Sequence, residues 1–158
     1  MKGAIRSSMR GKLKSLQTEY IECESKKVFE RLSTLPEYIQ SSGVSIFLSM
    51  NGEVQTSGII ANAFSIKKKV TIPKIMGKKS EDMFMFEVLN EDQLETFPKN
   101  SWGIAEPPMD IVLQSQDCTY NGFIDLVLVP GVAFDEYCGR LGHGKGYYGM
   151  RFRYLFMS

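Results

Sequence analysis

The sequence is poor in the residues that build metal sites and disulfide frameworks. Its 158 residues include one histidine and three cysteines, and Cys23, Cys118 and Cys138 are widely spaced with no CxxC pair. A structural zinc site or a set of disulfides is therefore not expected, and unpaired thiols fit a reducing compartment. No apolar run approaches the roughly 18 residues that a membrane-spanning helix needs, so we expect no membrane partner.

The chain also lacks an excess of one charge. Lysine and arginine number 19 against 18 aspartate and glutamate, which gives a net charge of +1. This balance offers no argument for nucleic acid as a partner. Hydrophobic residues make up 43% and charged residues 23%, as in globular proteins, and the length suits one domain over residues 1–158.

Acidic residues are missing from the start of the chain. Between Met1 and Thr18 the only charged residues are basic: Lys2, Arg6, Arg10, Lys12 and Lys14. Apolar residues recur at helical spacing and predict a helix over about residues 3–17. A basic start is typical of an organelle transit peptide, and equally of a functional helix that meets phosphates. We favour the functional helix and a cytoplasmic location, with mitochondria as the alternative.

Strand and helix patterns alternate along the rest of the chain. Helices are predicted over about residues 21–32 and from a cap at Thr56 or Ser57 to about residue 64. Strands are predicted over residues 44–48, 67–73, 83–88 and 123–129, an extended loop around Trp102 at 98–108, and a helix from 147 to 156. We expect the lysine run 67–69 to be a solvated edge. The alternation predicts an α/β fold with its ligand at the carboxyl ends of the strands.

A glycine-rich stretch, GRLGHGKGYY at residues 139–148, follows the apolar run 125–131. Glycines let backbone N–H groups approach a ligand, Arg140 and Lys145 supply charge, and the tyrosine pair supplies flat faces. The stretch therefore predicts a phosphate-binding loop beside an aromatic platform. It is not the NTPase loop, because Gly146 stands where that loop has a magnesium-binding hydroxyl, and the dinucleotide fingerprint is absent too.

The run DLVLVPGVAFD at residues 125–135, followed by the glycine-rich stretch, resembles the 5-formyltetrahydrofolate cyclo-ligase family, also called methenyltetrahydrofolate synthetases. The family pattern there is approximately PGxxFDxxGxRLGxGxGYYD. Residues 44–50 with Glu53, the segment FPKNSWGI at 97–104 and RGKLK at 10–14 match other family segments in the same order. The resemblance implies a three-layer, Rossmann-like sheet flanked by helices.

It also implies an ATP-dependent cyclisation of 5-formyltetrahydrofolate to 5,10-methenyltetrahydrofolate, with release of ADP and phosphate. The formyl oxygen would attack the γ-phosphate, and N10 would then close the ring as phosphate leaves. The implied cofactors are ATP and Mg²⁺, the implied partner is the folate, and we expect a monomer.

The resemblance assigns roles to particular residues. Those implied to bind ATP are Arg6, Arg10, Lys14, Arg140, Leu141, Gly142, His143, Gly144, Lys145, Gly146, Tyr147 and Tyr148. Those implied to bind the folate are Leu48, Met50, Glu53, Trp102, His143, Gly144, Lys145, Gly146 and Tyr147. Lys145, Arg140 and Tyr147 are the implied catalytic residues. From the residues alone we expect Tyr148 to pack rather than to bind.

Two positions depart from the family. His143 stands where the family usually has arginine, and Gly149 stands where it has an aspartate that binds magnesium, so no metal ligand is predicted. Family members also continue for a few dozen residues past the point that Ser158 occupies, so the chain resembles a C-terminally truncated form. These departures leave a second function open, that of a non-catalytic form that binds folate or ATP.

Overall fold

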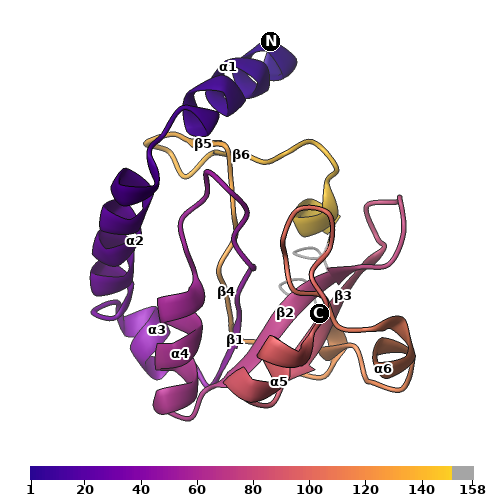
Figure 1. Cartoon of the computed structure of the whole chain (residues 1–158). Helices are drawn as coiled ribbons and strands as arrows, with labels where there is room; N and C mark the ends of the chain where they lie inside the picture. Colours follow the sequence, from indigo (N-terminus) through magenta and orange to yellow (C-terminus); the bar gives the residue numbers. More distant parts are fainter. Residues whose placement is uncertain (151–158) are drawn as a thin grey trace.

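A computed structural model describes residues 1–150 of the chain (Figure 1). Its larger helices are α1 (Lys2–Lys14), α2 (Thr18–Leu32) and α4 (Ser57–Ser65), and its short ones are α3 (Pro36–Gln40), α5 (Glu91–Thr96), α6 (Met109–Leu113) and the 3-10 helix η1 (Cys118–Tyr120). Its strands are β1 (Gly43–Ser45), β2 (Lys69–Ile75), β3 (Met83–Val88), β4 (Leu126–Val127), β5 (Ala133–Phe134) and β6 (Arg140–Leu141).

The main sheet has four strands in the order β3-β2-β1-β4. Strand β1 pairs in parallel with β2 and with β4, whereas β3 returns antiparallel to β2 as a hairpin. The predicted α/β fold is therefore confirmed, with a mostly parallel sheet. Strands β5 and β6 form a separate antiparallel hairpin that carries the start of the glycine-rich stretch.

One face of the sheet is apolar and is covered by helices. Register places Val44 beside Val70 and Ile72 beside Phe86, so these side chains share that face. They pack against Ile59, Ile60 and Ala63 of α4, and Phe97 and Val112 extend the same core over β3. Burial of these side chains holds α4 and α5 against the sheet.

The opposite face is covered by other parts of the chain. Met83 and Met85 project there and pack against Cys118 of η1, with Phe123, Ile124, Tyr147 and Tyr148 around them. Because Tyr147 and Tyr148 pack here, the end of the glycine-rich stretch lies on this face. Residues 147–150 are helical, and the rest of the helix predicted over 147–156 lies outside the described residues. The sheet is therefore the middle of three layers, and the side chains of the second face reach toward the glycine-rich stretch.

Two predicted strands are shorter than expected. Strand β1 ends at Ser45 and β4 at Val127, although hydrogen bonds from Ile46 N to Thr71 O and from Leu128 N to Ser45 O continue each ladder by one residue. Beyond these bonds the chains separate. Phe47 and Leu48, which were predicted to extend β1, line a cavity at this end of the sheet.

Two local predictions need correction. Lys68 is not on a solvated edge: it is 8% exposed and its ammonium donates to the carbonyls of Ser41 and Ile39. Thr56 is the N-cap residue of α4, one of the two predicted positions, but its hydroxyl makes no capping hydrogen bond because it donates to the Phe47 carbonyl instead. Both side chains satisfy backbone carbonyls from distant segments, which no local pattern reveals.

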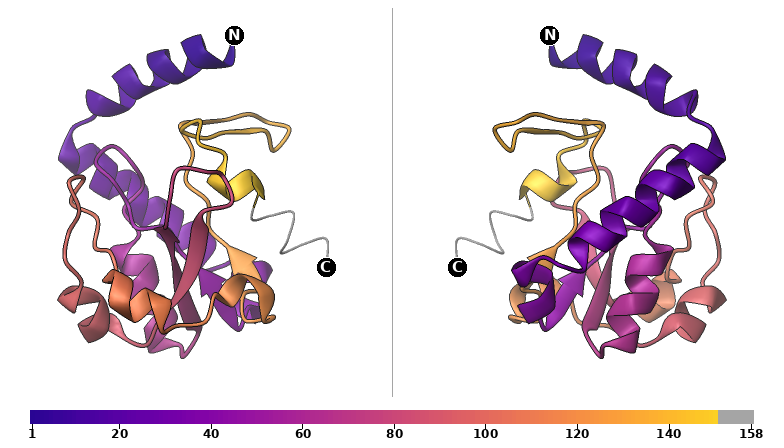
Figure 2. Two further views of the ribbon diagram at one scale, coloured as in Figure 1. Left: turned by 90° about the vertical axis from the view of Figure 1, so that its right-hand side faces the viewer. Right: turned by 90° about the vertical axis from the view of Figure 1, so that its left-hand side faces the viewer.

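Helix α1 lies apart from the body of the molecule, above the β5–β6 hairpin (Figures 1 and 2). None of its residues is buried. Its contact with the glycine-rich stretch comes from two guanidinium groups, because Arg6 Nε donates to Gly142 O at 2.9 Å and Arg10 Nη2 donates to His143 O at 2.7 Å. The basic helix and the glycine-rich stretch therefore meet, as the sequence suggested.

Candidate active site

A cavity of about 720 Å³ opens at the carboxyl ends of the three parallel strands. Leu48 and Met50 follow β1, Ile75 ends β2, and Pro130 follows β4, and all four line the cavity. Its volume is within the range of sites for small molecules and cofactors. The carboxyl ends of parallel strands are where α/β proteins place their ligands, so the cavity agrees with the fold-based expectation.

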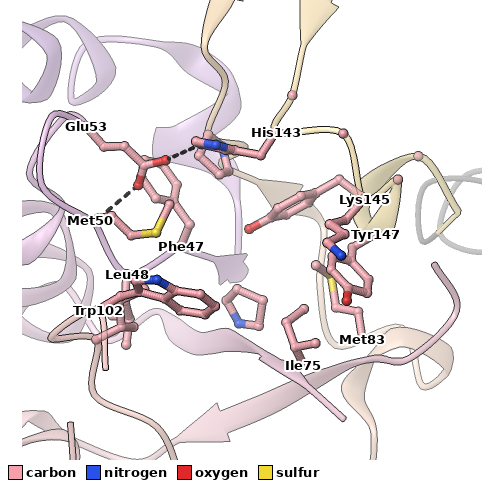
Figure 3. Close-up of a pocket in the computed structure, with 18 of the residues that line it drawn as sticks. Phe47, Leu48, Met50, Glu53, Ile75, Met83, Trp102, His143, Lys145 and Tyr147 are labelled. Atoms are coloured by element: carbon pink, nitrogen blue, oxygen red, sulfur yellow. Dashed lines mark hydrogen bonds and ion pairs between the residues drawn. The ribbon is translucent and has the colours of Figure 1, made fainter. Parts of the chain in front are cut away.

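One wall is built around the carboxylate of Glu53. Its Oε2 accepts from Met50 N at 3.0 Å, and its Oε1 lies 3.1 Å from His143 Nε2 (Figure 3). The Glu53 side chain is only 9% exposed, whereas that of His143 is 37% exposed. The two contacts fix the carboxylate at the cavity wall, and lone pairs on its oxygens remain for a ligand that carries N–H groups.

The floor of the cavity is apolar. Leu48 and Trp102 lie on one side of the floor and Ile75 and Met83 on the other (Figure 3). Trp102 is 73% exposed as a residue although it lines the cavity, so it stands at the mouth rather than in the core. A flat, ring-shaped ligand would bury apolar surface against these four side chains.

The glycine-rich stretch forms the opposite wall. Gly144 and Gly146 have φ angles of 109° and 79°, a region that other residues adopt only with strain. The carbonyls of Gly142 and His143 are turned toward α1, where Arg6 and Arg10 bind them. Four cationic side chains line this side of the cavity: Arg6, Arg10, Arg140 and Lys145.

Lys145 and Arg140 differ in how they are held. Among residues 1–150, Lys145 makes no hydrogen bond or ion pair that would compete with a ligand, and it is exposed. Arg140 donates from Nε to Pro130 O at 2.7 Å, and its guanidinium lies 5.3 Å from the ring centre of Tyr148. Burial lowers the pKa of Arg140 from its ordinary value, yet a guanidinium stays charged at neutral pH. Lys145 is therefore the more available cation.

The two tyrosines pack against the second face of the sheet. The Tyr147 hydroxyl donates to Gly77 O at 3.0 Å, in the turn between β2 and β3. Burial raises the pKa of the Tyr148 phenol well above its ordinary value, so it stays neutral. Both tyrosines pack with Met83 and Met85, as expected for Tyr148, and both also line the cavity.

All of the residues predicted to bind ligands line this cavity except Lys14 and Leu141. Lys14 is the exposed last residue of α1, and Leu141 pairs with Ala133 in the β5–β6 hairpin. The lining residues that the sequence analysis did not single out are Phe47, Pro73, Ile75, Met83, Asn100, Ile104, Glu106 and Pro130. Phe47, Pro73 and Pro130 lie at or next to the carboxyl end of a predicted strand, so the rule that ligands bind at strand ends could have found these three.

The described residues offer no ligand set for a metal ion. In residues 1–150 no group of three or more His, Cys, Asp or Glu side chains comes together. The acids that line the cavity are Glu53 and Glu106, and both already accept hydrogen bonds or ion pairs from protein groups. The backbone at Gly149 also lines the cavity, but it carries no carboxylate.

The fold is that of an α/β protein with a cavity at the ends of its parallel strands, and this cavity has a cationic glycine-rich wall beside an apolar floor. The family model for the 5-formyltetrahydrofolate cyclo-ligase family matches residues 1–158, and the chain belongs to that family of ligases. The resemblance seen in the sequence is thereby confirmed.

Individual relatives agree with this assignment. A protein of Caenorhabditis elegans named as a probable 5-formyltetrahydrofolate cyclo-ligase is 36% identical over 94% of this chain and 70% of its own length. A protein of Arabidopsis thaliana named as the mitochondrial enzyme is 32% identical over 93% of this chain and 55% of its own length. The solved 5,10-methenyltetrahydrofolate synthetase of Aquifex aeolicus superposes with a TM-score of 0.75 at 27% identity, covering 98% of this chain and 73% of that one.

Proposed function

We propose that this chain catalyses the ATP-dependent conversion of 5-formyltetrahydrofolate to 5,10-methenyltetrahydrofolate, with release of ADP and phosphate. The observation that carries the proposal is that one cavity brings together a cationic glycine-rich wall, an apolar floor and a fixed carboxylate. The cationic wall suits a triphosphate, the apolar floor suits a pterin ring, and the carboxylate suits the N–H groups on the polar edge of the pterin.

The cationic wall has the phosphoryl-transfer role in this proposal. The formyl oxygen attacks the γ-phosphorus and ADP leaves; N10 then attacks the formyl carbon, and phosphate departs as the ring closes. No protein nucleophile is needed, so the protein contributes position and charge. Lys145 and Arg140 balance the charge that builds on the transferred phosphoryl group. Arg6 and Arg10 hold the glycine-rich wall in place and add positive charge beside it.

The folate occupies the other half of the cavity. The Glu53 carboxylate accepts from N–H groups of the pterin, and Leu48, Met50 and Trp102 contact the ring. Tyr147 lies between the two halves, because it is near Lys145 on one side and Met83 on the other (Figure 3). We assign it to the reacting formyl group, which must meet the γ-phosphate at this border.

Magnesium does not fit the described residues as a protein-held ion. No acidic cluster exists within residues 1–150, and the carboxylates of Glu53 and Glu106 are engaged by protein donors. The proposed reaction therefore has no step in which a metal ion held by the protein takes part. The chain's own cations carry the charge stabilisation that is proposed here.

The proposal is tested by mixing the protein with 5-formyltetrahydrofolate and ATP in magnesium buffer. The absorbance of methenyltetrahydrofolate should rise, and ADP should form only when the folate is present. Lys145→Ala should suppress both signals, while the exposed Lys78→Ala in the turn after β2 should leave them unchanged.

The alternative is a non-catalytic form that binds folate or ATP. It would be favoured if calorimetry shows binding of 5-formyltetrahydrofolate while no methenyltetrahydrofolate and no ADP are formed. Absence of both binding and turnover by folded protein would contradict both functions.

We also propose that the protein is located in the cytoplasm and is a monomer. No helix within residues 1–150 is long and apolar enough to cross a membrane. Because one relative is named as mitochondrial, imaging of the full chain fused to a fluorescent protein at its C-terminal end is the direct test of compartment. Light scattering of the purified chain tests the monomer.

A further inference from the structure

A chain of polar contacts connects strand β2 to the loop that carries Trp102. Lys74, near the end of β2, lies 2.5 Å from Glu106 Oε2 and its side chain is only 10% exposed. The other carboxylate oxygen, Glu106 Oε1, accepts from Asn100 Nδ2 at 2.7 Å. Asn100 Oδ1 in turn accepts from Trp102 N at 2.9 Å and from Ile104 N at 3.1 Å. In this relay of Lys74, Glu106 and Asn100, Glu106 contacts its two partners through different oxygens, and Asn100 contacts Glu106 through Nδ2 and the loop backbone through Oδ1.

The backbone closes the same loop at its base. Glu106 N donates to Pro98 O at 2.9 Å, and Asn100 N donates to Ile104 O at 2.9 Å. Residues 99 and 105 form an isolated antiparallel bridge. The loop over residues 98–106 is therefore a closed turn. Ala105 packs against the apolar core, and the polar side-chain connection from the loop to the sheet is the Lys74–Glu106 pair.

Trp102 itself has little packing to hold it. Its side chain is 73% exposed, yet it lines the cavity opposite Tyr147 and Met83 (Figure 3). A side chain this exposed has no close-packed surroundings to select one rotamer, so its position depends on its backbone. That backbone is fixed by Asn100, and Asn100 is fixed by the ion pair with the sheet.

We propose that Lys74, Glu106 and Asn100 are positioning residues that hold Trp102 over the folate half of the cavity. The proposal deepens the proposed function and rests on it for the identity of the ligand. Placing an aromatic face in advance lowers the ordering cost of binding, because the loop does not have to find its conformation in the complex. The relay thus acts on the affinity for the folate rather than on phosphoryl transfer.

The ion pair is well suited to this task because it is costly to break. Lys74 is nearly buried, so removing the Glu106 charge leaves an ammonium without a partner in a poorly solvated place. Arg at position 74 would retain the charge and the pair, whereas an uncharged residue would not. Lys99 offers a matched control, because it lies in the same loop and is exposed, and no side-chain ion pair or hydrogen bond joins it to residues 1–150.

Trp102 is the only tryptophan in the chain, so its fluorescence reports on this loop without any label. The test compares the wild type with Glu106→Gln, Asn100→Asp, Lys74→Arg and Lys99→Met in the absence of ligand. The time-resolved anisotropy of Trp102 should show a loss of residual anisotropy in Glu106→Gln and Asn100→Asp. The residual anisotropy should remain at the wild-type level in Lys74→Arg and Lys99→Met.

Asn100→Asp is the sharper variant, because it keeps the oxygen acceptors for the N–H groups of Trp102 and Ile104. It loses the Nδ2 donor and sets a second carboxylate against Glu106, so only the link to the sheet is broken. If Glu106→Gln does not fold, the Asn100→Asp variant still tests whether the relay positions Trp102. Equal anisotropy in Asn100→Asp, the wild type and Lys99→Met would overturn the proposal.

Kinetics give the second readout. In Glu106→Gln and Asn100→Asp the KM for 5-formyltetrahydrofolate should rise about tenfold or more while kcat and the KM for ATP change by less than about threefold, the signature of lost ground-state binding. A fall in kcat with an unchanged folate KM would overturn the positioning role. If the wild type forms no methenyltetrahydrofolate, the proposed function fails instead, and the anisotropy measured without ligand still decides the role of the relay.

Discussion

The histidine of the glycine-rich stretch pairs with a carboxylate that comes 90 residues earlier: His143 Nε2 lies 3.1 Å from Glu53 Oε1. The contact joins the wall assigned to the triphosphate to the wall assigned to the pterin. Glu53 lies in the turn after β1, and His143 follows the β5–β6 hairpin. The two halves of the proposed site are therefore in direct contact in the protein without ligand, and either residue can be used to probe the other half.

Glu53→Gln should weaken folate binding more than ATP binding. The amide presents one oxygen where the carboxylate has two and carries no charge, so an N–H group of the pterin loses a charged acceptor while Met50 N retains its own. A lost hydrogen bond to a charged group costs about 1.5–3 kcal/mol, so the KM for 5-formyltetrahydrofolate should rise roughly 10- to 150-fold. Steady-state kinetics with each substrate varied measure the two constants.

Glu95→Gln is the control for this variant, because Glu95 is exposed on α5 and does not line the cavity. A Glu53→Gln enzyme with unchanged folate KM would contradict the assignment of this carboxylate to the pterin.

Lys145→Ala should reduce kcat far more than Lys78→Ala. Lys145 lines the cavity and has no competing partner within residues 1–150, so it is available to balance charge on a transferred phosphoryl group. Removal of one such donor from an active site typically lowers kcat by about 10²–10³-fold. Single-turnover formation of ADP in the presence of folate separates this step from product release. An equal effect of the two alanine variants would show that Lys145 acts only through the overall charge.

Gly149→Asp should raise the response of the enzyme to magnesium. Gly149 lines the cavity, and a Cβ at this position meets no atom of residues 1–150 within 4 Å, so an aspartate fits without displacing any of those residues. The resemblance to the family places a magnesium-binding aspartate here. The variant should lower the magnesium concentration needed for half-maximal activity, which a titration at fixed ATP measures. Gly149→Asn, which has the same shape but no charge, should not reproduce the effect.

The Lys74–Glu106 pair should make stability depend on pH in the acid range. Burial would raise the pKa of Glu106, but hydrogen bonds from Lys74 and Asn100 and the Lys74 charge outweigh it, so this pKa lies below its ordinary value of 4.5. Because the folded pKa is the lower one, the stabilisation is present above the ordinary value and is lost as pH falls through the folded one. The difference in melting temperature between wild type and Glu106→Gln should therefore be largest near neutral pH and shrink in acid. A difference that is constant with pH would contradict the depressed pKa.

Local patterns predicted much of the fold because they depend on residues close in sequence. The apolar spacing of α2 and the residues of β3 are such patterns, and the structure has a helix over Thr18–Leu32 and a strand over Met83–Val88. The expectation that a ligand binds at the carboxyl ends of the strands also matches the cavity. That rule needs only the order of the elements, which the sequence supplies.

The parts that the sequence analysis missed depend on pairings across the fold. In the sequence Lys68 is one of three consecutive lysines, a pattern that predicts exposure to solvent. In the structure it is buried, because its ammonium donates to the carbonyls of Ser41 and Ile39. Glu106 and Lys74 are 32 positions apart, and neither lies in a recognisable motif. A charged residue is assigned to solvent by default, and only tertiary structure shows that a partner makes burial tolerable.

The layer on the second face of the sheet can be tested through the cysteines. Cys118 is 3% exposed, whereas Cys23 and Cys138 are exposed. Burial, with a contribution from the Glu87 charge, raises the pKa of the Cys118 thiol, so little reactive thiolate forms. Cys23 and Cys138 should react quickly with a soluble disulfide reagent in the native protein, and Cys118 only after denaturation. Peptide mass spectrometry after labelling assigns each reaction to its cysteine.

Because Met83 both packs on Cys118 and lines the cavity, saturating 5-formyltetrahydrofolate should slow the reaction of Cys118 further by stabilising the closed layer. Equal rates for all three thiols would mean that η1 does not cover this face.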